Sequence, residues 1–169
     1  MTAQLLLVRH GSAGSRSRWA GPDHLRPLDA KGHRQAEALA AAWTGAQAPP
    51  ISKVLSSPYL RCVQTVEPLA GRVGLSVKTE PALAEGHGAA AVALARDLLA
   101  RKGAGSSPAG RMTVLCTHGD IIPAILAEVA ADGVDVGSDP RWSKGSAWLL
   151  EGASGLFTAA HYRPPAPPT

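Results

Sequence analysis

Apolar residues in this chain form short runs that alternate with longer segments of helical spacing. Short apolar runs bounded by polar residues are typical of strands buried on both faces of a sheet. They predict strands at Leu5–Val8, Lys53–Leu55, Ser76–Lys78, Met112–Thr117, Trp148–Leu150 and Leu156–Tyr162, the last two joined as a hairpin across Glu151–Gly155. Helices are predicted at Ala30–Ala46, after Ser57-Pro58, at Gly88–Lys102 and at Ile121–Ala131. The alternation predicts an α/β fold, a three-layer αβα sandwich with a mostly parallel central sheet.

Local signals mark several helix ends. Asp29 is a predicted N-cap, and Ser57 is another, with Pro58 at the first helical position. Proline lacks the backbone N–H, so Pro68 predicts a kink or a restart in the second helix. The glycine- and serine-rich segment Gly103–Gly110 predicts a turn.

Two histidines directly follow predicted strands. His10 comes after the first strand, and His118 comes after Met112–Thr117. In parallel α/β sheets, ligands bind beyond the carboxyl ends of the strands. The pattern therefore predicts that these histidines meet, although they are far apart in the sequence.

Composition favours one domain. With 169 residues and 45% hydrophobic content, the chain suits a single core, so we expect one domain over residues 1–163 and a proline-rich tail at 164–169. Cys62 and Cys116 stand in apolar stretches and form no CxxC pair or ligand cluster, which favours a reducing compartment. No signal peptide or apolar segment of membrane-spanning length is found. We expect a cytoplasmic protein without a membrane partner.

The net charge of +4 is concentrated near the N-terminus, much of it in the irregular loop predicted at Ala13–Pro27. The first 34 residues contain Arg9, Arg16, Arg18, Arg26, Lys31 and Arg34 against only Asp23 and Asp29. Such an excess favours phosphate or another anionic small molecule. The region has Trp19 as its only aromatic residue and contains no nucleic-acid-binding motif, which disfavours nucleic acid as a partner.

Four sequence blocks carry a more specific signal. They are LLLVRHGSAG, RPLDAKGHRQAEALA, SSPYLRCVQTVEPLA and VLCTHGD, in this order over about Leu5 to Asp120. Together they resemble the histidine phosphatase superfamily, also called the phosphoglycerate mutase-like family. The resemblance implies the phosphoglycerate mutase-like fold and a phosphatase that forms a covalent phosphohistidine.

Phosphoryl transfer needs an in-line nucleophile, cations on the equatorial oxygens and a proton for the leaving oxygen. The resemblance makes His10 the nucleophile and His118 a donor to the phosphoryl group. Arg9 and Arg61 have planar forks of donors that match phosphate oxygens, and Gly11 is expected to let the backbone approach the phosphate. Arginines nearby are expected to depress the pKa of His10 and keep it neutral.

The sequence does not decide which residue donates the proton to the leaving oxygen. Glu85, in the stretch PALAEG, lies where many members of the family place a catalytic carboxylate. Asp23, in the arginine-rich loop, is the rival. Some small relatives that act on phosphohistidine need no acid, because an imidazole leaving group depends less on protonation than an alkoxide.

Further candidates surround this set. Ser12 is a candidate hydrogen-bond donor to phosphate, or else a solvated loop serine. We expect one or two loop residues to contact the rest of an anionic substrate, and the candidates are Arg16, Arg18, Arg26 and His24. The stretch RWSKGSAWLL resembles the same region of phosphatase domains fused to actinobacterial Nudix hydrolases, and its Lys144 either approaches the site or belongs to a plain strand-entry turn.

Other chemistries lack their motifs. A Cys-x5-Arg phosphatase loop starting at Cys116 requires arginine at position 122, which is Ile122. The sequence has no HExxH, P-loop or GxSxG motif, and its six histidines do not stand at metal-ligand spacings. We therefore expect catalysis without a metal or cofactor.

The substrate is a phosphorylated protein or a small phosphate ester. The short distance from Glu85 to His118 leaves no room for a large insertion over the site, which favours an open pocket and a SixA-like phosphohistidine phosphatase. Members of that branch usually lack a residue equivalent to Glu85, so a nucleotide or sugar-phosphate phosphatase is the first alternative. A catalytically inactive phosphate-binding module is a second alternative. A mutase is disfavoured because it needs a closed lid.

Overall fold

The computed structural model describes residues 2–101 and 111–167, and the predicted turn at Gly103–Gly110 lies outside this part. The strands are β1 (Ala3–Arg9), β2 (Ile51–Ser56), β3 (Val77–Thr79), β4 (Met112–Thr117), β5 (Ala147–Ala153) and β6 (Leu156–Arg163). They form one sheet in the order β3-β2-β4-β1-β5-β6. All six predicted strands are present.

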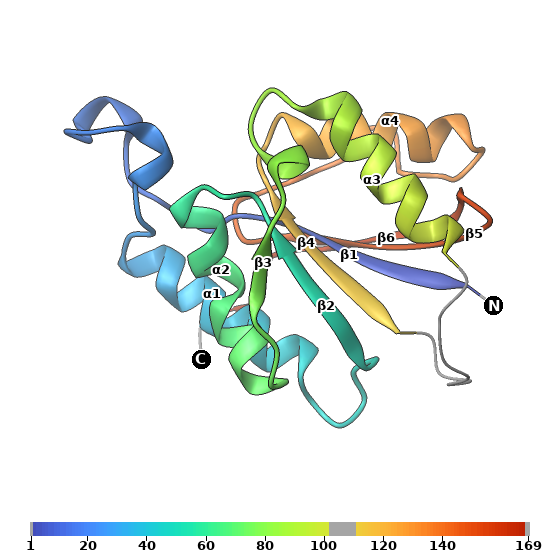
Figure 1. Cartoon of the computed structure of the whole chain (residues 1–169), viewed down its shortest axis with the longest axis horizontal. Coiled ribbons are helices and arrows are strands. Elements are labelled where there is room, and N and C mark those ends of the chain that lie inside the picture. Colours follow the sequence, from blue (N-terminus) through green and yellow to red (C-terminus); the bar gives the residue numbers. More distant parts are fainter. Residues whose placement is uncertain (1, 102–110, 168–169) are drawn as a thin grey trace.

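The sheet is mixed, with its parallel strands on one side. β1 is parallel to β4, β4 to β2 and β2 to β3, whereas β5 is antiparallel to β1 and to β6. The β5–β6 hairpin turns at Ser154 and Gly155, both of which have positive φ. Because β1, β2 and β4 run the same way, the loops that follow them emerge at one edge of the sheet (Figure 1).

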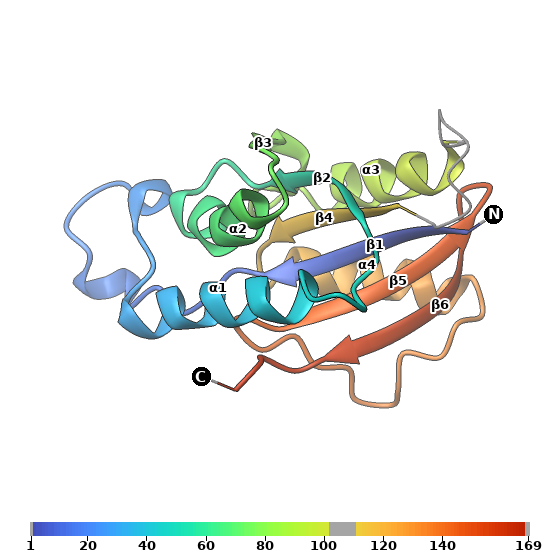
Figure 2. The same ribbon diagram turned by 90° about the horizontal axis from the view of Figure 1, so that it is seen from below.

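Helices cover both faces of the sheet (Figures 1 and 2). They are α1 (Ala30–Trp43), α2 (Leu60–Arg72), α3 (Gly88–Ala100) and α4 (Ile121–Ala131), with 3-10 turns at Arg16–Arg18, Asp23–Leu25 and Pro81–Leu83. Successive strand residues point to opposite faces, so Leu6 of β1 packs in the core under α1 and α2, and Leu7 packs under α3 and α4. The predicted three-layer αβα fold is confirmed.

The first helix begins where the sequence predicts. The Asp29 carboxylate accepts from the backbone N–H of Gly32 at 2.8 Å, which satisfies a donor of the first turn. The helix ends at Trp43, three residues before the predicted end at Ala46. There the Thr44 hydroxyl donates to the Ala40 carbonyl at 2.6 Å and satisfies one of the last acceptors.

Two predictions for the second helix were wrong. The N-cap position is Tyr59 rather than Ser57, and the helix begins at Leu60, because the Ser57 hydroxyl is engaged with His118. Of the kink or restart predicted at Pro68, the restart is wrong, because the helix continues through Pro68 to Arg72. Leu69 is fully buried after the proline, and burying such a side chain stabilises by about 1.5–3 kcal/mol, comparable with the roughly 3 kcal/mol that an internal proline costs.

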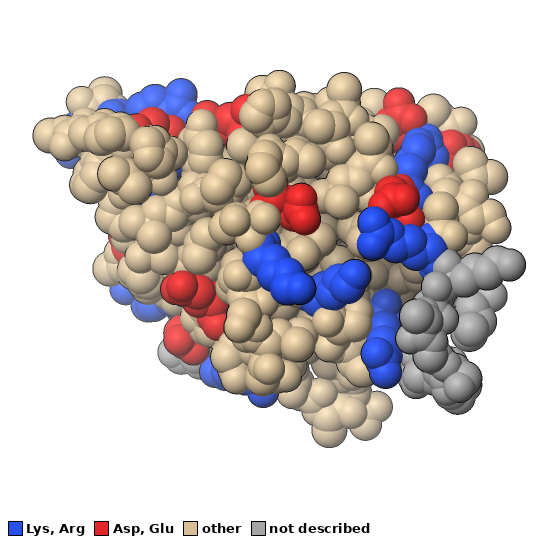
Figure 3. Space-filling view, viewed as in Figure 1, with Lys and Arg blue, Asp and Glu red and all other residues tan. Residues whose placement is uncertain are grey.

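Cysteines, helix length and surface charge are the features that the remaining sequence expectations concern. Cys62 and Cys116 are both free and buried. Over residues 2–101 and 111–167, no helix has the length and apolar character needed to cross a membrane. On the face shown in Figure 3, lysine and arginine side chains form small separate groups with aspartate and glutamate between them, rather than one continuous basic surface.

Close packing of two glycines joins the loop after β1 to α1. A Cβ on Gly32 would stand 2.0 Å from the carbonyl oxygen of Ser12, and a Cβ on Gly11 would stand 3.1 Å from the carbonyl oxygen of Gly32. Both obstacles are backbone atoms, which cannot move without displacing the segment that carries His10. The approach of α1 therefore fixes the position of this loop.

We expect Gly32→Ala to lower the free energy of unfolding by about 2–3 kcal/mol, because the new methyl group overpacks a backbone contact. The matched control is Gly71→Ala, in the exposed part of α2, where a Cβ meets no atom within 4 Å. This change should stabilise by roughly 0.5–1 kcal/mol through helix propensity. Urea denaturation measures both, and equal or greater stability of Gly32→Ala would contradict the packing argument.

Candidate active site

His10 lies at the carboxyl end of β1 with its backbone held on both sides. Its N–H donates to the Thr117 carbonyl at 3.1 Å, and its own carbonyl accepts from Gly145 N–H at 3.1 Å. The ring Nδ1 lies 2.8 Å from the Gly11 carbonyl oxygen, which can only accept. Nδ1 therefore carries the proton, and Nε2 keeps its lone pair available for bonding.

Burial keeps the His10 imidazole neutral. The side chain is only 5% exposed, and this burial is the main cause that lowers its pKa to about 3. The hydrogen bond to Gly11 opposes the shift, whereas the charges of Arg61 and Arg9 and the neighbouring His118 add to it. A neutral imidazole with a free Nε2 is a nucleophile at neutral pH.

Arg61 brings a fully buried guanidinium to this nitrogen. Its Nε lies 3.4 Å from Nε2 of His10, at 0% exposure of the residue. The outer nitrogens donate to the Asp23 carbonyl at 2.9 Å, to the Asp23 carboxylate at 3.1 Å and to the Glu85 carboxylate at 2.8 Å. The first turn of α2 thus presents a fork of donors next to the nucleophilic atom.

His118 faces His10 across the site, as the strand-end pattern predicts. The two ring centroids are 5.4 Å apart, and His118 is 1% exposed. Its Nε2 is 2.8 Å from the Ser57 hydroxyl, which also accepts from Tyr59 N–H at 3.2 Å. This pairing fits a tautomer in which Ser57 donates to Nε2 and the proton of His118 stands on Nδ1, 3.4 Å from Glu85.

Two carboxylates lie at the mouth of the site, where they share arginine partners. Arg16 contacts both Glu85 oxygens at 3.1 Å and Asp23 at 3.3 Å. The loop that carries Glu85 is fixed by Gly86 N–H, which donates to Asp120 at 2.8 Å. Asp23 and Glu85 thus occupy the donors of Arg16 and Arg61 that match phosphate oxygens.

Asp23 differs from Glu85 in the number of cations that bind it. It pairs with Arg26 at 3.0 Å as well as with Arg61 and Arg16. Burial by itself would raise its pKa, but the hydrogen bonds and charges of Arg26 and Arg61 outweigh this and lower the pKa. An ionised Asp23 is poorly suited to donate a proton, which favours Glu85 among the two candidates.

Arg9 stands at the carboxyl end of β1, and Lys144 lies in the turn before β5. Arg9 Nη1 donates to the Trp142 carbonyl at 2.9 Å, and its guanidinium lies so close to Gly119 that a Cβ there would be 2.8 Å from it. Burial lowers the pKa of Lys144 first, followed by the charges of Arg9 and Arg26. Lys144 lies in an exposed turn directly before β5, as the strand-entry interpretation has it, and its neighbour Gly145 donates to the carbonyls of Arg9 and His10.

The expectation that Ser12 donates to phosphate needs correction, and Gly11 has a packing role of its own. The Ser12 hydroxyl donates to Asp29 at 2.6 Å, so its hydrogen is used in fixing the helix cap rather than directed at a ligand. The backbone of Gly11 comes close to Gly32 of α1, and its N–H donates to the Thr65 hydroxyl at 3.0 Å. Both residues hold the loop around His10, because α1 and α2 supply their partners.

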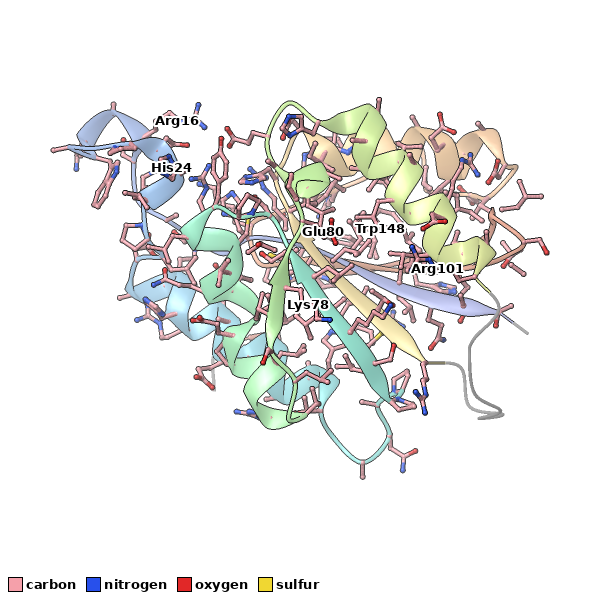
Figure 4. All side chains as sticks on the ribbon, in the orientation of Figure 1. Arg16, His24, Lys78, Glu80, Arg101 and Trp148 are labelled. Carbon is pink, nitrogen blue, oxygen red and sulfur yellow. The ribbon has the colours of Figure 1, made fainter. Side chains whose placement is uncertain are left out.

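The arginine-rich loop divides into inward and outward side chains. Arg26 is 7% exposed and donates to the Ala13 carbonyl, so it stabilises the loop itself. Arg18 is exposed. Figure 4 shows Arg16 and His24 on the loop between β1 and α1, and His24 packs edge-on against Tyr59 with ring centroids 6.3 Å apart. Arg16 and His24 are therefore the loop residues best placed to meet a substrate.

Sequence reasoning missed two side chains that support the site. The Tyr59 ring lies 4.7 Å from the His118 ring and 4.9 Å from the guanidinium carbon of Arg61. The Thr65 hydroxyl donates to the Arg61 carbonyl at 2.6 Å, besides accepting from Gly11. The signal for Thr65 was its spacing of four residues from Arg61, which places both on one helix face.

No candidate metal centre accompanies these residues. In the described ranges, no group of three or more His, Cys, Asp or Glu side chains is arranged to hold a metal ion. The site instead gathers two histidines, two carboxylates and a surplus of cations around a nucleophilic nitrogen. Such a set suits transfer of an anionic group.

Comparison with known proteins identifies the family. Residues 5–103 match the sequence profile of the histidine phosphatase superfamily (branch 1). The chain therefore belongs to the histidine phosphatase superfamily, which confirms the family that the sequence resembles.

Relatives include an 8-oxo-(d)GTP phosphatase of Mycolicibacterium smegmatis, 37% identical over 166 residues. The alignment covers 97% of this chain but 49% of the relative, so the chain spans about half of that protein's length. The protein histidine phosphatase SixA complexed with tungstate is similar in fold, with a TM-score of 0.76, 23% identity and coverage of 96% and 97% of the two chains. A mycobacterial glucosyl-3-phosphoglycerate phosphatase follows, with a TM-score of 0.69, 20% identity and coverage of 96% and 97%.

The low pKa of His10 predicts acid sensitivity. The unfolded chain protonates this residue below about pH 6.5, whereas the folded protein does so only near pH 3. Stability conferred by the neutral form is therefore complete above pH 6.5 and is lost as the pH falls toward 3, by about 1.4 kcal/mol per unit. Between pH 7 and 5, the loss of unfolding free energy should be about 2 kcal/mol smaller in His10→Asn than in wild type. Identical pH profiles from urea titrations would contradict the assignment.

Proposed function

We propose that the chain is a phosphatase in which Nε2 of His10 attacks phosphorus. The observation that carries this proposal is the hydrogen bond from His10 Nδ1 to the Gly11 carbonyl, which leaves Nε2 unprotonated beside the Arg61 guanidinium. A phosphoryl group placed there accepts from Arg61 in place of the Asp23 carboxylate, while Glu85 stays close enough to protonate the leaving oxygen. This exchange replaces one set of anionic oxygens by another at the same donors.

The reaction proceeds in two displacements. First the P–N bond to His10 forms while the P–O bond of the ester breaks, and Glu85 donates a proton to the leaving oxygen. A water then attacks the phosphohistidine and gives its proton to Glu85, which releases orthophosphate and restores His10. His118 and the arginines stabilise the charge on the transferred oxygens.

For the substrate we propose a small phosphate ester, with a nucleotide as the favoured class. Glu85 is held within 2.8 Å of Arg61 and 3.4 Å of His118, where it can serve an alkoxide or phosphate leaving group. The Mycolicibacterium smegmatis relative, which carries a nucleotide phosphatase name, also favours this class. The SixA structure shares the fold at 23% identity, so it supports the architecture rather than a substrate.

Phosphohistidine on a protein is the second candidate. Between Glu85 and His118 the described residues form α3 and β4, and the sequence between the two ends is too short for a large domain over the site. This short connection is the observation that favours a protein-borne phosphoryl group. We also propose that the chain works in the cytoplasm as a single domain over residues 1–163.

The nucleophile is tested by turnover of p-nitrophenyl phosphate in EDTA, with a search for acid-labile phosphate on the quenched protein. His10→Asn should lower kcat by at least about 10³-fold and abolish the acid-labile phosphate on the protein, because no other side chain replaces the nucleophile. His161→Asn, at an exposed position of β6, is the matched control and should retain activity. A wild type inactive on this ester and on phosphohistidine would instead indicate a phosphate-binding module.

The proton donor is tested by the leaving group. Glu85→Gln should lose about 10²-fold or more on an alkyl phosphate and much less on p-nitrophenyl phosphate or phosphohistidine, whose leaving groups need little protonation. Asp23→Asn should affect these substrates equally, since Asp23 positions Arg61. If Asp23→Asn, rather than Glu85→Gln, lost activity mainly on the alkyl phosphate, Asp23 would be the donor. If each variant lost the same activity on all substrates, neither carboxylate would be the acid.

A further inference from the structure

The side-chain amide of Gln35, on α1, is hydrogen-bonded at both ends beside the nucleophile. Its Oε1 accepts from Ser12 N–H at 2.8 Å, and its Nε2 donates to the Lys144 carbonyl at 3.0 Å. A backbone N–H only donates and a backbone carbonyl only accepts, so both ends of the amide are assigned by their partners. Methionine or glutamate at this position would lose one or both of these bonds.

Two glycines enclose the amide and leave it little freedom. A Cβ on Gly11 would stand 3.1 Å from Gln35 Oε1, and a Cβ on Gly145 would stand 2.9 Å from Gln35 Cδ. Gly145 also has a positive φ of 81° and donates its N–H to the His10 carbonyl at 3.1 Å. The half-buried side chain of Gln35 is therefore held between the loop of His10 and the turn before β5.

The bond from Ser12 orients the peptide group that contacts the His10 ring. Ser12 N–H and the Gly11 carbonyl belong to one planar trans peptide unit, in which the N–H and the C=O point in opposite directions. With the N–H directed at Gln35, the carbonyl on the other side reaches His10 Nδ1 at 2.8 Å. Hydrogen bonds in such a chain polarise one another, so the bond to Gln35 also makes the Gly11 carbonyl a better acceptor.

The tautomer of His10 depends mainly on this carbonyl. Among the described residues, the Gly11 carbonyl is the only acceptor bonded to the ring. Arg61 Nε donates to Nε2 and favours the same tautomer, but over a longer distance of 3.4 Å. The proton that one ring nitrogen carries is set by the hydrogen bond that it makes. Turning the Gly11–Ser12 peptide would therefore allow the proton to move to Nε2, where it blocks the lone pair.

We infer that Gln35 is a positioning residue for phosphoryl transfer, which holds the Gly11–Ser12 peptide so that the Nε2 lone pair of His10 is directed at phosphorus. The inference rests on the proposed function. When Nε2 attacks, the P–N bond forms, the P–O bond of the ester breaks, and the ring becomes positively charged while Nδ1 keeps its proton. The Gly11 carbonyl then accepts from a cationic donor, which makes this bond stronger in the transition state than in the free enzyme. Gln35 thus contributes more to the reaction than to substrate binding.

Nitrogen NMR of the imidazole ring measures the tautomer without any need for turnover. In the wild type at neutral pH, Nδ1 of His10 should be protonated and Nε2 unprotonated. Gln35→Met has a similar length and no amide, so a measurable share of the Nε2–H form should appear. Gln35→Glu keeps an acceptor for Ser12 N–H and should restore the wild-type tautomer. An unchanged tautomer in Gln35→Met would overturn the inference, and a mixed tautomer in Gln35→Glu would assign the effect to the Lys144 contact instead and overturn it too.

The matched control is Gln64→Met. Gln64, half-buried on α2, accepts from the backbone N–H of Leu28 at 2.9 Å. Its replacement removes the same kind of bond from the same long loop, but away from the Gly11–Ser12 peptide. The tautomer of His10 should stay as in the wild type. A mixed tautomer in this control as well would mean that any loosening of the loop has the same effect, and would overturn a specific role for Gln35.

Kinetics separate orientation of the nucleophile from binding of the anion. Gln35→Met should lower kcat/KM for p-nitrophenyl phosphate about tenfold or more, because a slightly misplaced reacting group slows the reaction strongly. The inhibition constant of orthophosphate should change less than about twofold, since Arg61 and His118 remain. Proportional losses in kcat/KM and in orthophosphate affinity would place Gln35 in anion binding and overturn the inference. A wild type without turnover, but with a tautomer that depends on Gln35, would reject the proposed function and retain the control of His10 by Gln35.

Discussion

The guanidinium of Arg61 carries a full charge at a position with no exposure to solvent, and the active-site end of the molecule is arranged around that charge. A buried cation costs several kcal/mol in desolvation unless it is paired and hydrogen-bonded. Asp23 supplies an opposite charge and Glu85 accepts a further hydrogen bond, from segments far apart in the sequence. The neutral ring of His10 lies against Nε. Satisfying one arginine thus brings the loop after β1, the start of α2 and the Glu85 loop into a common site.

This arrangement also explains how the free protein is held ready for an anion. The carboxylates of Asp23 and Glu85 accept from the same donors that a phosphoryl group requires, which keeps Arg61 and Arg16 oriented before the substrate binds. Donors that are oriented in advance need little rearrangement during the reaction, and this lowers the free energy of the transition state. Arg9 stands apart from these carboxylates, so the site combines a neutralised half with a half that keeps its positive charge.

Two errors in the sequence predictions, at Ser57 and Ser12, share one origin, which is competition for hydrogen-bond partners. Ser57 has the composition of an N-cap, yet His118 of another strand takes its hydroxyl, and the helix starts at Leu60. Ser12 stands beside the nucleophile, but Asp29 of the next helix is its partner. In each case local sequence describes what a side chain is able to do, and a residue distant in the chain decides what it does.

The sequence by itself determined the strands and helices, the presence of His10 and His118 at strand ends, and the family, because periodicity, proline and glycine positions and the four motif blocks are local properties. Only the tertiary structure decided that Glu85 and Asp23 share Arg61 and that Tyr59 and Thr65 support the site. These relations depend on the parallel pairing of β1, β2 and β4 and on the packing of α1 against the loop of His10. Pairing and packing join residues that no spacing along the chain connects, so their charges and hydrogen bonds become defined only when the sheet and its helices are assembled.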